Sequence, residues 1–157
     1  MKLFYRNAAA TLFEKVHSLS DYHNSWRCIH LKLSRKRERY NQQLLIYFVI
    51  KGIAEILAND DGYIYLCRDG DIFILFQGLM GPVLDKLGDH FADIDPDNAP
   101  DEAGSRFMTI YDLSRDWNLF FNLCYTKSRC MNLLNEAPDY SWYHYAGKEM
   151  AEGLGEA

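Results

Sequence analysis

The stretch YLCRDGDIFILFQG, residues 65–78, places Asp69-Gly70 between two short runs rich in aromatic and β-branched residues. Such runs are typical of strands, and an Asp-Gly pair between them is the strongest local signal for a β-hairpin. We expect a two-residue type I′ turn, in which both central residues adopt positive φ. The hairpin therefore defines two adjacent antiparallel strands, at 63–67 and 71–76, around which the other elements are arranged.

The sequence on either side of this hairpin switches between strand and helix patterns. Upstream, residues 27–34 alternate as a strand does, and residues 38–58 carry apolar side chains at the three- and four-residue steps of a helix. Downstream, the patterns predict a helix at 82–92, a strand at 106–113 and an amphipathic helix at 114–135. The order β-α-β-β-α-β predicts an α+β, ferredoxin-like fold. Its sheet would have four antiparallel strands, with both crossover helices on one face and extra N- and C-terminal helices.

The chain divides into three parts. Residues 1–26 form an N-terminal segment with a helix expected at 9–26, and residues 27–135 form the core. Residues 136–157 form a tail that begins with aromatic residues and ends in a segment expected to be flexible. The crowded aromatic residues of the tail predict exposed surface of the kind that contacts partners; they are Tyr140, Trp142, Tyr143 and Tyr145.

Composition and charge exclude several classes of protein. The chain has 157 residues and is 48% hydrophobic, which suits one domain with its own core and excludes a disordered protein. Its net charge of −5 opposes a general nucleic-acid binder. The longest apolar run, residues 44–50, is too short to cross a membrane, and the N-terminus lacks the apolar core of a secretory signal. We expect a cytoplasmic protein with reduced thiols at its four cysteines, Cys28, Cys67, Cys124 and Cys130.

The hairpin sequence resembles the signature of GGDEF-type nucleotide cyclases. Residues 69–73, DGDIF, match that signature at three of its five positions. In the family the signature also lies on a hairpin between the second and third strands of the same element order. The resemblance covers residues 25–135 and implies a signalling domain.

The same resemblance implies that the chain is a degenerate member without cyclase activity. Asp69 replaces a glycine at which active members bring their backbone close to a nucleotide phosphate, and its carboxylate would repel that phosphate. Ile72 replaces an essential glutamate, and residues 27–36 contain no acidic residue where active members carry a metal-binding aspartate. Residues 60–63, DDGY, also lack the arginine of the family's Arg-x-x-Asp feedback motif. Because phosphoryl transfer needs a metal to neutralise charge, we expect no catalytic residues, no metal and no cofactor.

Two groups of residues remain candidates for binding a ligand. Asp69, Gly70 and Asp71 form the hairpin turn. Arg35 and Arg37 belong to a basic run that directly follows the first strand, and arginine suits the recognition of oxyanions such as phosphate. The simpler interpretations are a turn exposed to water and a solvated start of the next helix. The acidic loop at 93–98 lacks the glycine and glutamate of a calcium-binding loop, so we expect no ion there.

The expected function is a non-catalytic GGDEF-like domain that regulates or binds another protein. Its partner would be a different protein or a second copy of the chain, and nucleotide binding is the less favoured alternative. Neither nucleic acid nor a membrane is expected as a partner.

Two other functions remain open. An RNA-recognition module shares the βαββαβ order, but its stacking aromatics lie on one sheet face, whereas Phe73 and Phe76 are expected on opposite faces. A small enzyme of unknown type would use His30, Cys28 or Cys67.

Overall fold

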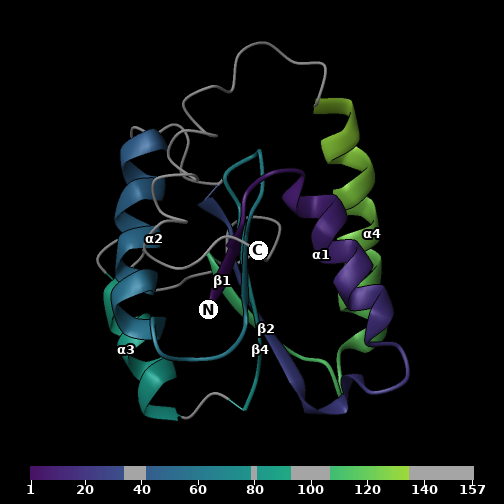
Figure 1. Ribbon diagram of the computed structural model, residues 1–157, viewed down its shortest axis with the longest axis horizontal. Helices are drawn as coiled ribbons and strands as arrows, with labels where there is room; N and C mark the ends of the chain where they lie inside the picture. Colours follow the sequence, from purple (N-terminus) through teal and green to yellow (C-terminus); the bar gives the residue numbers. More distant parts are fainter. Residues whose placement is uncertain (34–41, 79–80, 93–106, 135–157) are drawn as a thin grey trace.

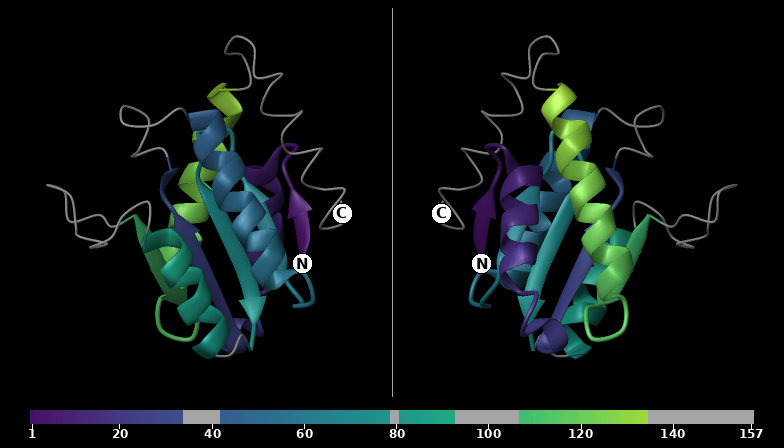
Figure 2. Two further views of the ribbon diagram at one scale, coloured as in Figure 1. Left: turned by 90° about the vertical axis from the view of Figure 1, so that its left-hand side faces the viewer. Right: turned by 90° about the vertical axis from the view of Figure 1, so that its right-hand side faces the viewer.

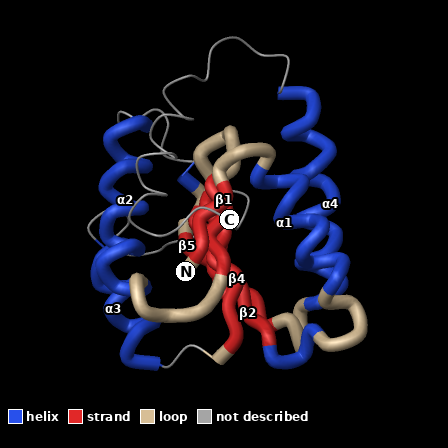
Figure 3. The backbone as a smooth tube through the Cα atoms, viewed as in Figure 1, coloured by secondary structure: helices blue, strands red, loops and turns tan. Residues whose placement is uncertain are grey.

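A computed structural model describes residues 1–33, 42–78, 81–92 and 107–134. Within these residues the chain forms three layers, with one sheet between two pairs of helices (Figures 1 and 3). The elements in chain order are β1 (Lys2–Phe4), α1 (Ala8–Ser18), a 3₁₀ turn η1 (His23–Ser25), β2 (Trp26–Leu31), α2 (Gln42–Leu57), β3 (Tyr63–Leu66), β4 (Ile72–Gln77), α3 (Gly81–Ala92), β5 (Met108–Asp112) and α4 (Trp117–Leu134).

The five strands form one mixed sheet in the order β1-β3-β4-β2-β5. Strands β3, β4, β2 and β5 are antiparallel to their neighbours in this order. The prediction of a purely antiparallel, four-stranded sheet is wrong, because β1 pairs in parallel with β3 at one edge. The fold is therefore α/β with a mixed sheet, and the first residues of the chain belong to that sheet.

Helices cover both faces of the sheet (Figure 2). Apolar side chains of α2 and α3 pack on one face, as predicted for the two crossover helices. Helices α1 and α4 pack together on the other face, which carries Cys28 and Phe73. That second face is thus buried, and His30 and Cys28 on it are only 3% and 0% exposed.

Strand β4 lies in the middle of the sheet and is buried on both sides. Its side chains alternate, with Ile72 and Ile74 in the α2/α3 core and Phe73 and Leu75 in the α1/α4 core. Phe76 joins Ile72, so the prediction that Phe73 and Phe76 lie on opposite faces is confirmed. This alternation decides which residues near the hairpin point toward α4.

The first helix is shorter than predicted, since α1 ends at Ser18 and strand β2 already begins at Trp26. The hydroxyl groups of Ser18 and Ser20 donate hydrogen bonds to the carbonyls of Lys15 and His17. Serine side chains that bond to nearby backbone groups compete with regular helical bonding, which favours a helix end.

Helices α2 and α3 meet at Gly52, where a methyl group would overlap the imidazole ring of His90. That ring stacks on Phe48 with 4.6 Å between ring centroids. Replacing Gly52 by alanine is expected to lower the free energy of unfolding by about 1–3 kcal/mol, because the ring must leave its position. Chemical denaturation measures this loss.

Gly88 provides the control in the same helix pair, because a Cβ atom there would meet no other part of the described chain within 4 Å. The Gly88→Ala variant is expected to gain up to about 1 kcal/mol from the higher helix propensity of alanine. Equal stabilities of the two alanine variants would contradict the proposed contact between Gly52 and His90.

Candidate functional site

The β3–β4 hairpin closes through a three-residue loop rather than the predicted type I′ turn. The amide of Cys67 donates to the carbonyl of Asp71 at 2.9 Å, and the amide of Gly70 donates to the carbonyl of Cys67 at 2.9 Å. Gly70 has a positive φ of 97°, whereas Asp69 does not. A turn followed by one left-handed glycine is the usual geometry of a three-residue hairpin loop. The Asp69 carboxylate completes it by accepting the amide of Asp71 at 3.0 Å.

Both carboxylates of this loop are held by a lysine from α4. The Lys127 ammonium lies 2.5 Å from Oδ2 of Asp69 and 2.6 Å from Oδ2 of Asp71. The three side chains are largely buried, with exposures of 13% for Lys127, 17% for Asp69 and 4% for Asp71. Charged hydrogen bonds in such surroundings are stronger than in water, because few water molecules compete for them.

A histidine from β2 binds the same oxygen of Asp71. The Nε2 atom of His30 lies 3.0 Å from Oδ2 of Asp71, and the His30 ring stacks on Phe73 with 4.1 Å between ring centroids. The Nδ1 atom of His30 is buried and has no hydrogen-bond partner among the described residues. Asp71 Oδ2 thus accepts hydrogen bonds from both the imidazole of His30 and the ammonium of Lys127. We call the four residues Asp69, Asp71, His30 and Lys127 the hairpin cluster.

The cluster keeps Asp71 ionised and Lys127 protonated. Burial alone would raise the pKa of Asp71, but the hydrogen bond from His30 and the charge of Lys127 outweigh burial and hold this pKa below its ordinary value. Burial would lower the pKa of Lys127, yet the charges of Asp71 and Asp69 raise it above its ordinary value. The lysine is therefore a permanent cation between two carboxylates.

His30 is neutral in this arrangement. Burial lowers the pKa of His30, the hydrogen bond and charge of Asp71 offset part of that effect, and the charges of Lys127 and Lys32 lower it further. Because ionised Asp71 can only accept, Nε2 of His30 carries the proton and Nδ1 presents a lone pair. The unpartnered Nδ1 atom is thus an acceptor.

Two members of the cluster, Asp71 and Lys127, lie at the ends of buried, otherwise apolar rows. Asp71 precedes Phe73 and Leu75 on the face of β4 that packs against α4. Lys127 continues the buried positions Phe120 and Cys124 of α4 at helical spacing. Sequence reasoning missed Lys127, although a lysine in the apolar row of an amphipathic helix is a signal for a buried acidic partner.

The structure brings some of the candidate residues predicted from sequence together and does not describe others. Asp69, Gly70 and Asp71 lie together in the loop, and the interpretation of a turn exposed to water is wrong because Asp71 is only 3% exposed. Arg35 and Arg37 lie outside the described residues. His30, considered as a residue of a possible small enzyme, belongs to the cluster.

Three cysteines belong to the core on the same side of the sheet as this cluster. Cys28, Cys67 and Cys124 are fully buried in the α1/α4 core. Burial is the main cause that raises the pKa of each thiol. Nucleophilic cysteines need the opposite shift, so these thiols give no support to the small-enzyme alternative.

No group of three or more histidine, cysteine, aspartate or glutamate residues in the described ranges is arranged to hold a metal ion. Within the same ranges, no helix is both long and apolar enough to span a membrane.

Comparisons with known proteins give the site no assigned chemistry. The chain matches no protein-family model, no curated protein and no solved structure.

Proposed function

We propose that the chain is a non-catalytic, GGDEF-like regulatory or protein-interaction domain of a signalling system. The antiparallel order β5-β2-β4-β3 supports the ferredoxin-like βαββαβ plan on which the resemblance depends. The DGDIF hairpin connects the two strands that this plan requires.

The observation that carries the proposal is the position of the Lys127 ammonium between both hairpin carboxylates. A divalent cation at this loop would have to displace a buried lysine from two short ion pairs. Without such a cation, the loop would lack the metal that neutralises the charge building up on a transferred phosphate. The arrangement favours a structural use of the two acids.

The chemistry of Ile72 supports the same conclusion. Ile72 stands where the signature has glutamate, and its side chain is fully buried in the α2/α3 core. The fourth signature position thus contributes to packing on the face opposite to Asp71.

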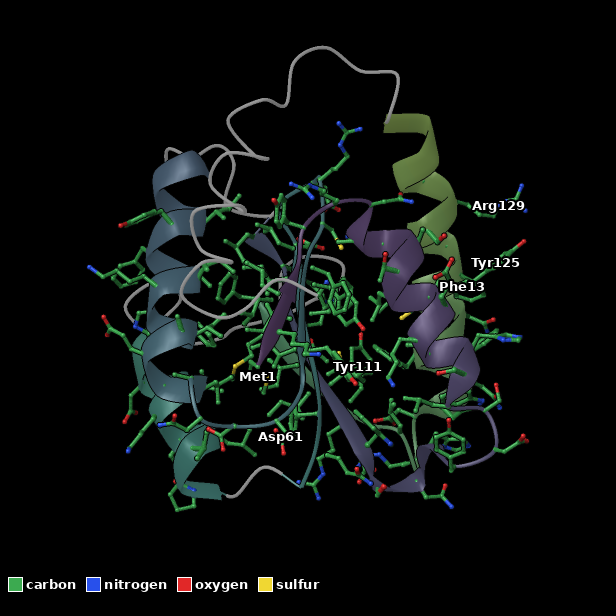
Figure 4. The ribbon with its side chains drawn as sticks, viewed as in Figure 1. Met1, Phe13, Asp61, Tyr111, Tyr125 and Arg129 are labelled. Carbon is green, nitrogen blue, oxygen red and sulfur yellow. The ribbon has the colours of Figure 1, made fainter. Side chains whose placement is uncertain are left out.

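An interaction role is supported by an aromatic surface on the outer side of α1 and α4. The ring of Phe13 lies 5.3 Å from that of Phe121 and 5.6 Å from that of Tyr125, between ring centroids. Tyr125 is 43% exposed and accepts a hydrogen bond of 2.7 Å from Arg129. Figure 4 shows Phe13, Tyr125 and Arg129 on the side of these helices away from the sheet. Tyrosine and arginine are frequent anchors of protein interfaces.

The RNA-recognition alternative finds less support. Its stacking surface would be the sheet face that carries Phe73, and that ring is fully buried under α4 and α1. Bases would reach the ring only if these helices moved away.

The proposal is tested by a GTP-turnover assay with magnesium and manganese, by calorimetric titration with GTP and cyclic dinucleotides, and by light scattering. We expect no turnover and a particle heavier than the 18.3 kDa monomer. The Tyr125→Glu variant should reduce self-association. The Tyr22→Glu variant changes a tyrosine that is 61% exposed but lies outside the aromatic surface of Phe13, Phe121 and Tyr125, so it should leave self-association unchanged. Turnover of GTP contradicts the proposal, as does a monomer that binds neither nucleotide nor protein.

A further inference from the structure

We propose that the outer face of α1 and α4 binds a second copy of the chain around a two-fold axis, with Glu14 of each copy paired to Arg129 of the other. The pairing rests on the interaction role proposed above and names the partner for that role. Two features of this face lead to it, the use of its charges and the position of its aromatic rings.

Helices α1 and α4 carry four formally charged side chains, which are Glu14, Lys15, Lys127 and Arg129. The ammonium of Lys15 lies over the rings of Trp26 and Tyr63, at 5.5 Å and 4.8 Å from their centroids. Lys127 is held by the two hairpin carboxylates. The remaining two, Glu14 and Arg129, are exposed and form no ion pair with other described residues. One charge of each sign is thus left for a partner.

These two charges lie on opposite sides of an aromatic pair. Helices α1 and α4 run antiparallel (Figure 1), and the rings of Phe13 and Tyr125 meet between them at 5.6 Å. Arg129 lies one turn beyond Tyr125 on α4 and donates to its hydroxyl at 2.7 Å. Glu14 follows Phe13 in the direction of the opposite end of the helix pair. The aromatic pair therefore separates a positive end of the face from a negative end.

A face of this kind is complementary to itself. A two-fold axis that lies in the interface and crosses the two helices along the rings of Phe13 and Tyr125 exchanges the two ends of the face. Glu14 of one copy then lies opposite Arg129 of the other. Because the axis relates the two copies, this ion pair occurs twice in the dimer.

The rest of the face suits a protein partner better than a polyanion. Phe121 packs against Phe13 with 5.3 Å between ring centroids, and Tyr125 is 43% exposed, so the centre is aromatic. The exposed side chains of Asn118 and Asn122 are uncharged and would lie at a polar rim. Nucleic acid and anionic membranes need an excess of positive charge, which a face with one charge of each sign lacks.

Charge reversal tests the pairing by light scattering at several protein concentrations, which gives the dissociation constant of a dimer of two 18.3 kDa chains. Glu14→Arg and Arg129→Glu should each raise this constant by about tenfold or more, because each reversal makes both ion pairs of the dimer repulsive. An equimolar mixture of the two variants should return to nearly the wild-type constant. In the mixed dimer, Arg at position 14 meets Glu at position 129, and Glu14 meets Arg129, so both pairs attract.

Two matched controls make the same changes in net charge elsewhere. Lys51→Glu and Glu55→Arg alter exposed residues of α2, on the opposite side of the sheet, and should leave the dissociation constant unchanged. A monomeric wild type, single reversals at positions 14 and 129 that associate like the wild type, or a mixture no tighter than its components would each overturn the pairing. The proposed function fails separately, since a monomer that binds a different protein contradicts only the two-fold pairing, whereas GTP turnover contradicts only the proposed function.

Discussion

The Ile72→Glu variant, which restores the acidic residue of the cyclase signature, is expected to lose at least about 4 kcal/mol of folding stability and to gain no GTP turnover. Ile72 is fully buried in the α2/α3 core, where the described neighbours of its cluster are apolar. A carboxylate placed there has no described partner to offset its desolvation. Since domains are stable by only about 5–15 kcal/mol, this loss removes much of the total.

Urea denaturation followed by circular dichroism measures this loss, and its pH dependence identifies the cause. Burial should raise the pKa of the new glutamate above its unfolded value of about 4.3, so the folded variant binds the proton more tightly. Its stability should consequently fall as the pH rises from about 4 to 8. Ile72→Val, which only removes a methyl group, should cost about 0.5–1.5 kcal/mol with no pH dependence. A stable Ile72→Glu variant that converts GTP would contradict both the packing and the proposed function.

The hairpin and the strands and helices around it were predictable because their signals are local. Residues 71–76 combine strand-forming residues with an adjacent Asp-Gly pair, and the crossover helices have wide apolar faces. Strand β1 escaped prediction because three residues are too few to establish alternation. Its burial depends instead on Leu3 fitting into the distant α2/α3 core.

The type of turn was not predictable, because both faces of the hairpin strands are buried. A two-residue turn would pair Leu66 with Phe73, whereas the observed register pairs Leu66 with Ile72 and Tyr65 with Phe73. A shift by one residue exchanges the faces, and hydrophobic patterning selects a register only when one face is polar. Here both faces are apolar, so the pattern fits either register.

The hairpin cluster combines residues that are far apart in the sequence. Asp71 and Lys127 are separated by 56 residues, and no local pattern connects them. Each is nevertheless a polar residue at a position that periodicity assigns to the core. A polar residue at a core position of this kind signals that it has a buried polar partner. The sequence does not identify that partner, because the contact between Asp71 and Lys127 depends on how α4 docks against the sheet.

Replacing Lys127 by methionine is expected to lower the free energy of unfolding by about 3–5 kcal/mol at neutral pH, the usual cost of breaking a buried ion pair. Methionine keeps the length and apolar stem of lysine, so packing along α4 is largely retained. What is lost is the cation between Asp69 and Asp71, whose side chains are only 17% and 4% exposed. The two carboxylates then repel each other in a place with little water to separate their charges.

A double-mutant cycle shows whether this loss arises from the ion pair. In the Lys127→Met background, Asp71→Asn should cost far less than in the wild type, because the ion pair with Lys127 that it would break is already gone. Arg115→Met breaks an ion pair whose arginine is 74% exposed, and no measurable change is expected. Despite burial, the hydrogen bond from His30 and the Lys127 charge hold the pKa of Asp71 below its ordinary value in the wild type. The Lys127→Met variant should therefore regain stability as acidification neutralises Asp71, while the wild type should not. Additive effects of the two substitutions, or a Lys127→Met variant as stable as wild type, would show that the lysine does not hold the hairpin.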